Sequence, residues 1–173
     1  MKKEKIFQVA WEHFFAKRYK DVKLDNIANS LNIRKPSLYY YFNDKKDLFL
    51  QTLKYSMDLY IQKLKNIVSE KDLEKFVHWY LKFPTDTKNV FAVAFQKWYC
   101  TDKDINSTIF SGKMIVEKTI QSFLKEFWWN NVKIYLVMNL LEKLAQDNCM
   151  DDYCLMYPIE EIYSEIKKIL ENN

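Results

Sequence analysis

The scarcity of turn residues is the feature that most limits the folds open to this chain. Its 173 residues include one glycine and three prolines, while aromatic residues make up 17%. Sandwiches, barrels and doubly wound sheets need many more turn residues, so the composition predicts an all-α protein. The length is sufficient for a substantial interior, as one compact unit or as two small ones.

Hydrophobic periodicity divides the chain into about nine helices. Apolar residues from Leu24 to Leu31 recur at the spacing of one buried helical face, and Asn32 then tolerates the positive φ of a sharp turn. Asp44 can cap the long fourth helix, and Pro84 should end the fifth. The expected helices cover residues 3–18, 24–31, 34–42, 45–68, 72–83, 88–100, 104–128, 131–148 and 158–172.

Positive charge gathers at the N-terminal end of the chain. Residues 1–50 hold 11 Lys and Arg against 6 Asp and Glu, which leaves 16 against 17 for the remainder. A polyanion releases condensed counterions when it binds Lys and Arg, so a nucleic acid at this end would explain the asymmetry. A solvated basic face explains it equally well, and charge alone does not choose between the two.

The patterns of cysteine, histidine and hydropathy argue against several other classes of protein. Cys100, Cys149 and Cys154 form no CxxC pair, and with only His13 and His78 they make no common zinc set, so we interpret them as reduced thiols. We expect no cofactor and no enzyme, because GxSxG, GxGxxG, P-loop and HExxH signatures are missing. Without a signal peptide or a window of about 18 apolar residues, the sequence predicts a cytoplasmic protein with no membrane partner.

The segment from Leu24 to Lys45 carries the functional signal. A helix of about two turns, a tight turn and a second short helix predict a helix-turn-helix, whose second helix enters the major groove of duplex DNA. A cation such as Lys45 near a helix N-terminus is disfavoured by the helix dipole unless an anion approaches, so we expect it to meet a phosphate. The predicted DNA-binding residues are Lys23, Arg34, Lys35, Ser37, Tyr39, Tyr40, Tyr41 and Lys45.

From Phe14 to about Phe49 the sequence resembles the DNA-binding domain of the tetracycline-repressor (TetR) family. The matching features are Phe15, Tyr19, Ile27 with Ala28, the turn at Asn32 and Ile33, the segment LYYYF at 38–42, Lys45 and Leu48. The chain departs from the family at Lys23, where a Ser or Thr cap is usual, and the missing cap should cost about 1 kcal/mol of helix stability. The resemblance implies a DNA-binding domain over residues 1–47 and an effector-binding and dimerisation domain over residues 48–173.

The resemblance also implies an effector pocket and a dimer interface in the C-terminal region. The aromatic stripes there are more often core than ligand site, although such rings and one acid could hold a lipophilic cation. The pocket candidates are Trp79, Phe83, Phe95, Trp98, Met114 and Glu117. The interface candidates, which an ordinary intrachain core would also explain, are Val132, Tyr135, Leu136, Leu140, Leu144, Ile159, Ile162 and Ile166.

These patterns and the family resemblance together predict a transcriptional repressor that binds a palindromic operator as a homodimer and is released by a small-molecule effector. Two half-sites about 34 to 36 Å apart require two helix-turn-helix motifs, and a homodimer provides one in each subunit. The alternative is a helical lipid- or protein-binding module without DNA readout. An activator with the same DNA-binding domain has the same sequence signals as a repressor.

Overall fold

The part of the chain that the structure describes is built from helices joined by turns, which confirms the all-α prediction. The computed structural model describes residues 3–17, 19–86, 102–127, 130–148 and 158–171. The expected helix over 88–100, the three cysteines, and the pocket candidates Phe95 and Trp98 lie outside these ranges. The elements are α1 (Lys3–Ala16), the 3₁₀ helix η1 (Tyr19–Asp21), α2 (Leu24–Ser30), α3 (Lys35–Leu38), α4 (Lys45–Ser69), α5 (Leu73–Asp86), α7 (Lys103–Phe127), α8 (Asn131–Asn148) and α9 (Ile159–Glu171).

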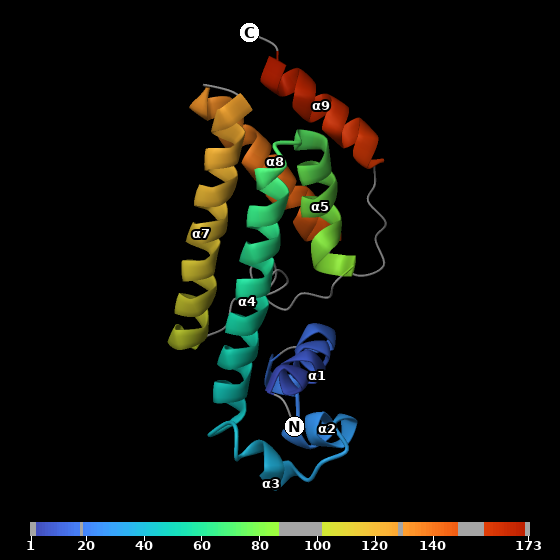
Figure 1. The fold of residues 1–173 in the computed structure, drawn as a ribbon, viewed down its shortest axis with the longest axis vertical. Helices are drawn as coiled ribbons and strands as arrows, with labels where there is room; N and C mark the ends of the chain where they lie inside the picture. Colours follow the sequence, from blue (N-terminus) through green and yellow to red (C-terminus); the bar gives the residue numbers. More distant parts are fainter. Residues whose placement is uncertain (1–2, 18, 87–101, 128–129, 149–157, 172–173) are drawn as a thin grey trace.

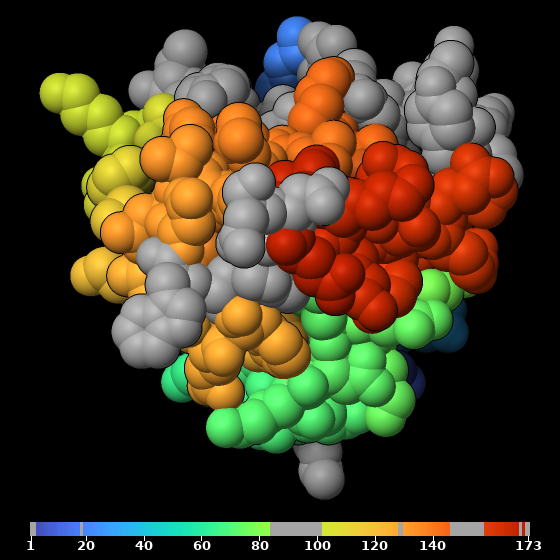
Figure 2. Space-filling view, turned by 90° about the horizontal axis from the view of Figure 1, so that it is seen from above, coloured from blue at the N-terminus to red at the C-terminus, as the bar shows by residue number. Residues whose placement is uncertain are grey.

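The helices form a small unit at one end of the molecule and a larger unit at the other, with α4 running through both (Figure 1). The helices α1, α2 and α3 gather near the first turns of α4, whereas α5 and α7 pack against its later turns. The larger unit is completed by α8, which packs on α5 and α7, and by α9, which packs on α5 and α8. Figure 2 shows α8 and α9 side by side at the end far from the small unit.

An aromatic cluster lies at the centre of the small unit. Ile6, Ala10 and Phe14 recur every four residues on α1 and are fully buried. The ring of Phe14 meets the ring of Phe49 from α4 edge-on at 4.7 Å, and the ring of Tyr19 lies 4.9 Å from Phe49. Burying a Phe side chain contributes about 1.5 to 3 kcal/mol, so this cluster is a main source of the unit's stability.

The long helix α4 belongs to both units. Near its middle, the ring of Tyr55 lies 5.1 Å from Phe7 of α1, and five residues later the ring of Tyr60 lies 5.3 Å from Trp79 of α5. Packing against α1 therefore continues beyond residue 47, where the sequence places the domain boundary. The 25 residues of α4 span roughly 37 Å at a rise of 1.5 Å per residue.

The first turn of α4 is closed by two acidic side chains, and the structure confirms the predicted cap at Asp44. The Asp44 carboxylate accepts the backbone N–H of Asp47 at 2.8 Å, and the Asp47 carboxylate accepts the backbone N–H of Asn43 at 2.9 Å. The Gln51 amide, which donates to Asp47 at 2.6 Å, and the Asn43 N–H lower the pKa of Asp47. Because this pKa is lowered, the stabilisation is present at neutral pH and is lost as the pH falls through the folded-state value.

Replacing Asp44 with alanine is expected to lower the free energy of unfolding by about 1 kcal/mol, because the substitution removes the cap acceptor. Urea denaturation measures the change. Asp58→Ala is a matched control, because Asp58 is an exposed acid within the same helix. Equal destabilisation by both substitutions would contradict the capping role.

Three helix ends differ from the sequence-based predictions by two or more residues. The helix α1 ends at Ala16 rather than at residue 18. The helix α3 covers a single turn, because the N–H groups of Tyr39 and Tyr41 bond back to nearby carbonyls in successive turns. The expected break at Pro84 is wrong, since α5 continues to Asp86. A proline so close to a helix end removes one late hydrogen bond and leaves the preceding turns intact.

The larger unit is held together by aromatic packing between helices. Phe76 of α5 and Phe123 of α7 are buried, with ring centroids 4.9 Å apart. The rings of Trp79 and Phe83 lie 5.3 and 5.5 Å from Tyr60, which joins α5 to α4. Within the described ranges, no helix combines the length and the apolar character that crossing a bilayer requires.

Candidate nucleic-acid interface and effector cavity

The turn between α2 and α3 has the backbone geometry that the sequence predicts. Asn32 has a φ of 54°, which is in the left-handed region that asparagine tolerates better than most residues. The Ala28 carbonyl accepts the N–H groups of Leu31 at 3.1 Å and of Ile33 at 3.0 Å, so the chain reverses tightly after α2. Ala28 is buried, which lets the two short helices approach closely. A helix-turn-helix is the result.

The helix α3 is anchored by its apolar face and presents tyrosines on the other side. Pro36 lies in its first turn, where the missing N–H costs no helical hydrogen bond. Leu38 and Phe42 are buried against the small unit's core, whereas Tyr39 is exposed and Tyr40 is 90% exposed. Tyr41, also predicted to bind DNA, is half-buried and packs against the core, with its ring 6.2 Å from Phe42.

The predicted cations around the motif differ in their surroundings. Lys23 and Arg34 are exposed at the N-caps of α2 and α3, and neither cap has a side-chain hydrogen bond, which confirms the missing cap expected at Lys23. Lys35 donates to the Asp25 carboxylate of α2 at 2.8 Å, and this hydrogen bond lowers the pKa of Asp25 and raises that of Lys35. Ser37 lies half-buried within α3. The pairing of Lys35 links the two helices of the motif.

The ammonium group of Lys45 points back into its own unit. Its Nζ donates to the backbone carbonyls of Tyr19 at 3.0 Å, Lys20 at 3.2 Å and Val22 at 3.2 Å. It also lies 4.6 Å from the centre of the Tyr19 ring, a favourable position for a cation. These contacts hold the segment before α2 in place. They also stabilise a cation at the N-terminus of α4, so no anion is needed to explain the lysine there. The phosphate contact of Lys45 stays a prediction.

A second lysine connects the small unit to α7. Lys46 donates to Asp104 at 2.6 Å and pairs with Asp102 at 2.9 Å, and both acids lie at the start of α7. The two hydrogen bonds raise the pKa of Lys46, and the bond from Lys46 lowers the pKa of Asp102. The sequence analysis missed these ion pairs, because the partners of Lys46 lie more than fifty positions away along the chain.

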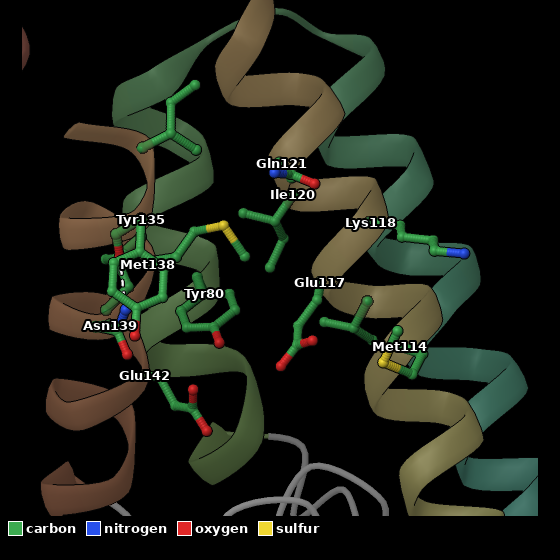
Figure 3. A pocket seen from close by; sticks show the side chains of 13 residues that line it. Tyr80, Met114, Glu117, Lys118, Ile120, Gln121, Tyr135, Met138, Asn139 and Glu142 are labelled. Carbon is green, nitrogen blue, oxygen red and sulfur yellow. Dashed lines mark hydrogen bonds between the residues drawn. The ribbon is translucent and has the colours of Figure 1, made fainter. Parts of the chain in front are cut away.

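A cavity of about 340 Å³ lies between α5, α7 and α8 (Figure 3). Two predicted pocket residues, Met114 and Glu117, line it. Trp79 and Phe83 do not, because they pack against Tyr60 instead. The sequence missed several lining residues on α8, although their spacing places them on one helical face. The lining residues are Tyr80, Met114, Val116, Glu117, Lys118, Ile120, Gln121, Ile134, Tyr135, Met138, Asn139, Leu141 and Glu142.

The predicted interface residues separate into two groups. Val132, Tyr135 and Leu136 of α8 are 67%, 67% and 53% exposed, while Leu140 and Leu144 are half-buried. The predicted isoleucines of α9 are buried within this chain, so assigning them to an exposed seam was wrong. The apolar stripe of α9 packs onto α5 and α8, and its outer positions are charged. The corrected residues are Ile159, Ile162 and Ile166.

Comparisons with known proteins agree with this geometry. The sequence profile of the family described as bacterial regulatory proteins, tetR family, matches residues 6–52. The biofilm operon icaADBC HTH-type negative transcriptional regulator IcaR of Staphylococcus aureus is 26% identical over 132 residues, which covers 73% of this chain and 69% of that protein.

Solved structures extend the likeness of the fold to the whole chain. The fatty acid degradation regulator FadR from Bacillus halodurans has a TM-score of 0.74 and 15% identity, covering 99% of this chain and 100% of that structure. The transcriptional regulator FadR from Bacillus subtilis, solved in complex with stearoyl-CoA, has a TM-score of 0.74 and 14% identity over the same shares. The small and large units together therefore have a fold already seen in regulators.

Proposed function

Because this chain belongs to the TetR family of bacterial regulators through its N-terminal domain, we propose that it is a cytoplasmic transcriptional repressor rather than an enzyme. In this proposal it binds a palindromic operator as a homodimer and is released by a small-molecule effector. The negative regulator IcaR supports the repressive role, and a regulator solved with stearoyl-CoA supports the effector. In this proposal the DNA-binding domain comprises residues 1–47 and the effector-binding and dimerisation domain residues 48–173, with the turns of α4 up to Tyr55 packed on α1.

The observation that carries this proposal is the exposure of Tyr40 on a rigid support. An aromatic side chain that is 90% exposed makes little contribution to folding. It stands on a one-turn helix that is fixed by the Asn32 turn and by the buried Leu38. This is the arrangement that reading a major groove requires, because a rigid wedge must present side chains to base edges and phosphates.

The proposed contacts to DNA divide by chemistry. Lys23, Arg34 and Lys45 would meet phosphates, which position the protein without reading sequence. Lys35, Ser37, Tyr39 and Tyr40 would face the groove, where Lys35 must exchange its bond to Asp25 for one to DNA. Tyr41 would act at most through its half-buried ring edge.

We propose that the second subunit packs on α8. Val132, Tyr135 and Leu136 form an exposed apolar strip there, with Leu140 and Leu144 at its edge. An isologous contact of this strip with itself gives a two-fold axis, and a palindromic operator would reflect that symmetry. The charged outer face of α9 would then lie at the rim of the interface.

Selection of genomic DNA fragments tests the proposed function. The purified full chain is mixed with genomic fragments from its own organism at two salt concentrations, and bound fragments are sequenced. A shared palindrome and a steep loss of affinity with salt are expected, because phosphate contacts release counterions. If no sequence is enriched even at low salt, a helical lipid- or protein-binding module becomes the better account.

Replacing Tyr40 with alanine is expected to weaken binding to the selected operator about tenfold or more, because a groove contact is lost in each subunit. The free energy of unfolding should not change, since the side chain is exposed. Fluorescence anisotropy measures the affinity, and Tyr40→Phe shows whether the hydroxyl or the ring makes the contact. Phe110→Ala, an exposed aromatic substitution on α7, is the control. If Tyr40→Ala and the control bind the operator with equal affinity, Tyr40 does not contact DNA.

A further inference from the structure

The effector cavity has an apolar wall and a charged end. Its wall is formed by buried side chains from two helices, among them Val116 and Ile120 of α7 and Leu141 of α8. Figure 3 shows the carboxylates of Glu117 and Glu142 pointing into the cavity from facing helices, at the same end. A ligand in this cavity would therefore place an apolar body against the wall and a polar group near these two acids.

Within the described ranges, the ammonium group of Lys113 pairs with both carboxylates. Lys113 Nζ lies 2.9 Å from Glu142 Oε1 and 3.6 Å from Glu117 Oε1. Burial lowers the pKa of Lys113, but the hydrogen bond and charge of Glu142 and the charge of Glu117 outweigh this effect, so the pKa is raised and the lysine stays charged. Among the described residues, these ion pairs set two carboxylates against one ammonium group at this end of the cavity.

Lys118, the lysine among the described lining residues, does not direct its charge into the cavity. Lys118 lines the rim, but its ammonium group points away from the cavity in Figure 3. Glu117 makes the longer of the two contacts with Lys113, so its carboxylate has capacity for another donor. Tyr80 and Met138 complete the surroundings with polarisable groups that tolerate a cation.

We propose that this cavity takes a small organic cation, a protonated amine on an apolar body, with its positive charge at Glu117 and Glu142. This inference rests on the proposed function and names the chemical class of its effector. An anionic ligand of the same shape would meet two carboxylates and a lysine that is already paired, so its charge would be repelled. The volume of about 340 Å³ limits the ligand to a compact molecule.

Three probes with one tail and different charges test the proposal on the full chain. Octylammonium, octanol and octanoate are titrated at neutral pH, and binding is followed by calorimetry. Octylammonium should bind about tenfold more tightly than octanoate, with octanol between them. Equal or tighter binding of octanoate, or no binding of any probe, would overturn the proposal. The selection of genomic DNA fragments does not depend on these probes. Failure of the cation proposal can therefore be distinguished from failure of the proposed function.

Variants that remove one charge test whether the cation binds at Glu117 and Glu142. Glu117→Gln should lower the affinity for octylammonium about tenfold and leave the affinity for octanol unchanged. Glu74→Gln removes an exposed charge from α5 and is the matched control, because Glu74 does not line the cavity. Lys113→Met should tighten octylammonium binding, because it removes the positive charge that pairs with both carboxylates. If Glu117→Gln binds octylammonium as the control does, or Lys113→Met binds it more weakly, the cation is not at these acids.

Discussion

Replacing Phe49 with alanine is expected to lower the free energy of unfolding by about 3 to 5 kcal/mol, because it leaves a large cavity in a small core. Phe49 is fully buried, and its ring touches those of Phe14 and Tyr19 at 4.7 and 4.9 Å. Through these contacts Phe49 packs α4 against both α1 and η1. Loss of this contact should release the DNA-binding domain from the long helix before the larger unit unfolds.

Urea denaturation with two probes measures this effect. Far-ultraviolet circular dichroism follows all helices, and hydrogen exchange of α1 and α2 amides follows the small unit alone. Phe110→Ala is the control, because Phe110 is 64% exposed on α7, and its change should stay within about 0.5 kcal/mol. A Phe49→Ala protein as stable as the control would show that the cluster does not hold the small unit.

Replacing Lys45 with methionine is expected to lower the free energy of unfolding by about 2 kcal/mol, because three carbonyls lose a charged donor. Tyr19, Lys20 and Val22 supply these carbonyls just before α2. Since α2 has no side-chain N-cap of its own, the loss should spread into its first turn. Backbone amides from residues 19–26 should exchange faster in the variant, while those of α5 and α7 should not.

The salt dependence of DNA binding tests the phosphate contact predicted for the same lysine. If Lys45 binds only backbone carbonyls, Lys45→Met leaves the slope of log affinity against log salt unchanged. If Lys45 contacts a phosphate, the substitution reduces the magnitude of this slope by about one. Lys5→Met is the matched control, because Lys5 is an exposed lysine of α1 outside the motif. Unchanged hydrogen exchange together with a reduced slope would show that Lys45 contacts a phosphate and does not stabilise the segment before α2.

Local features of the motif were predictable from the sequence. The Asn32 turn and the Asp44 cap each depend on a few neighbouring residues, so the type of residue was enough to identify them. The described helices after α4 were also predictable, because apolar periodicity over 13 or more residues leaves little choice of conformation.

Contacts between distant segments were not predictable in the same way. Lys45 was interpreted through its position on α4, yet its partners lie 23 to 26 positions earlier and became visible only in the fold. Lys113 and Glu142 are 29 positions apart and meet across two helices. The stripe of α9 fits an intrachain core and a dimer interface equally well by its spacing, and only burial separates the two.

The continuity of α4 has a consequence for how such a regulator can be rebuilt. Its N-terminal turns pack on α1 and its later turns on α5, so the two halves are held at a fixed angle by one uninterrupted helix. Inserting a single residue between Tyr55 and Tyr60 would rotate one half by about 100° and displace it by about 1.5 Å relative to the other. Chimaeric regulators joined within this helix must therefore preserve its helical phase, and four inserted residues, about 40° beyond one full turn, disturb the phase far less than two do.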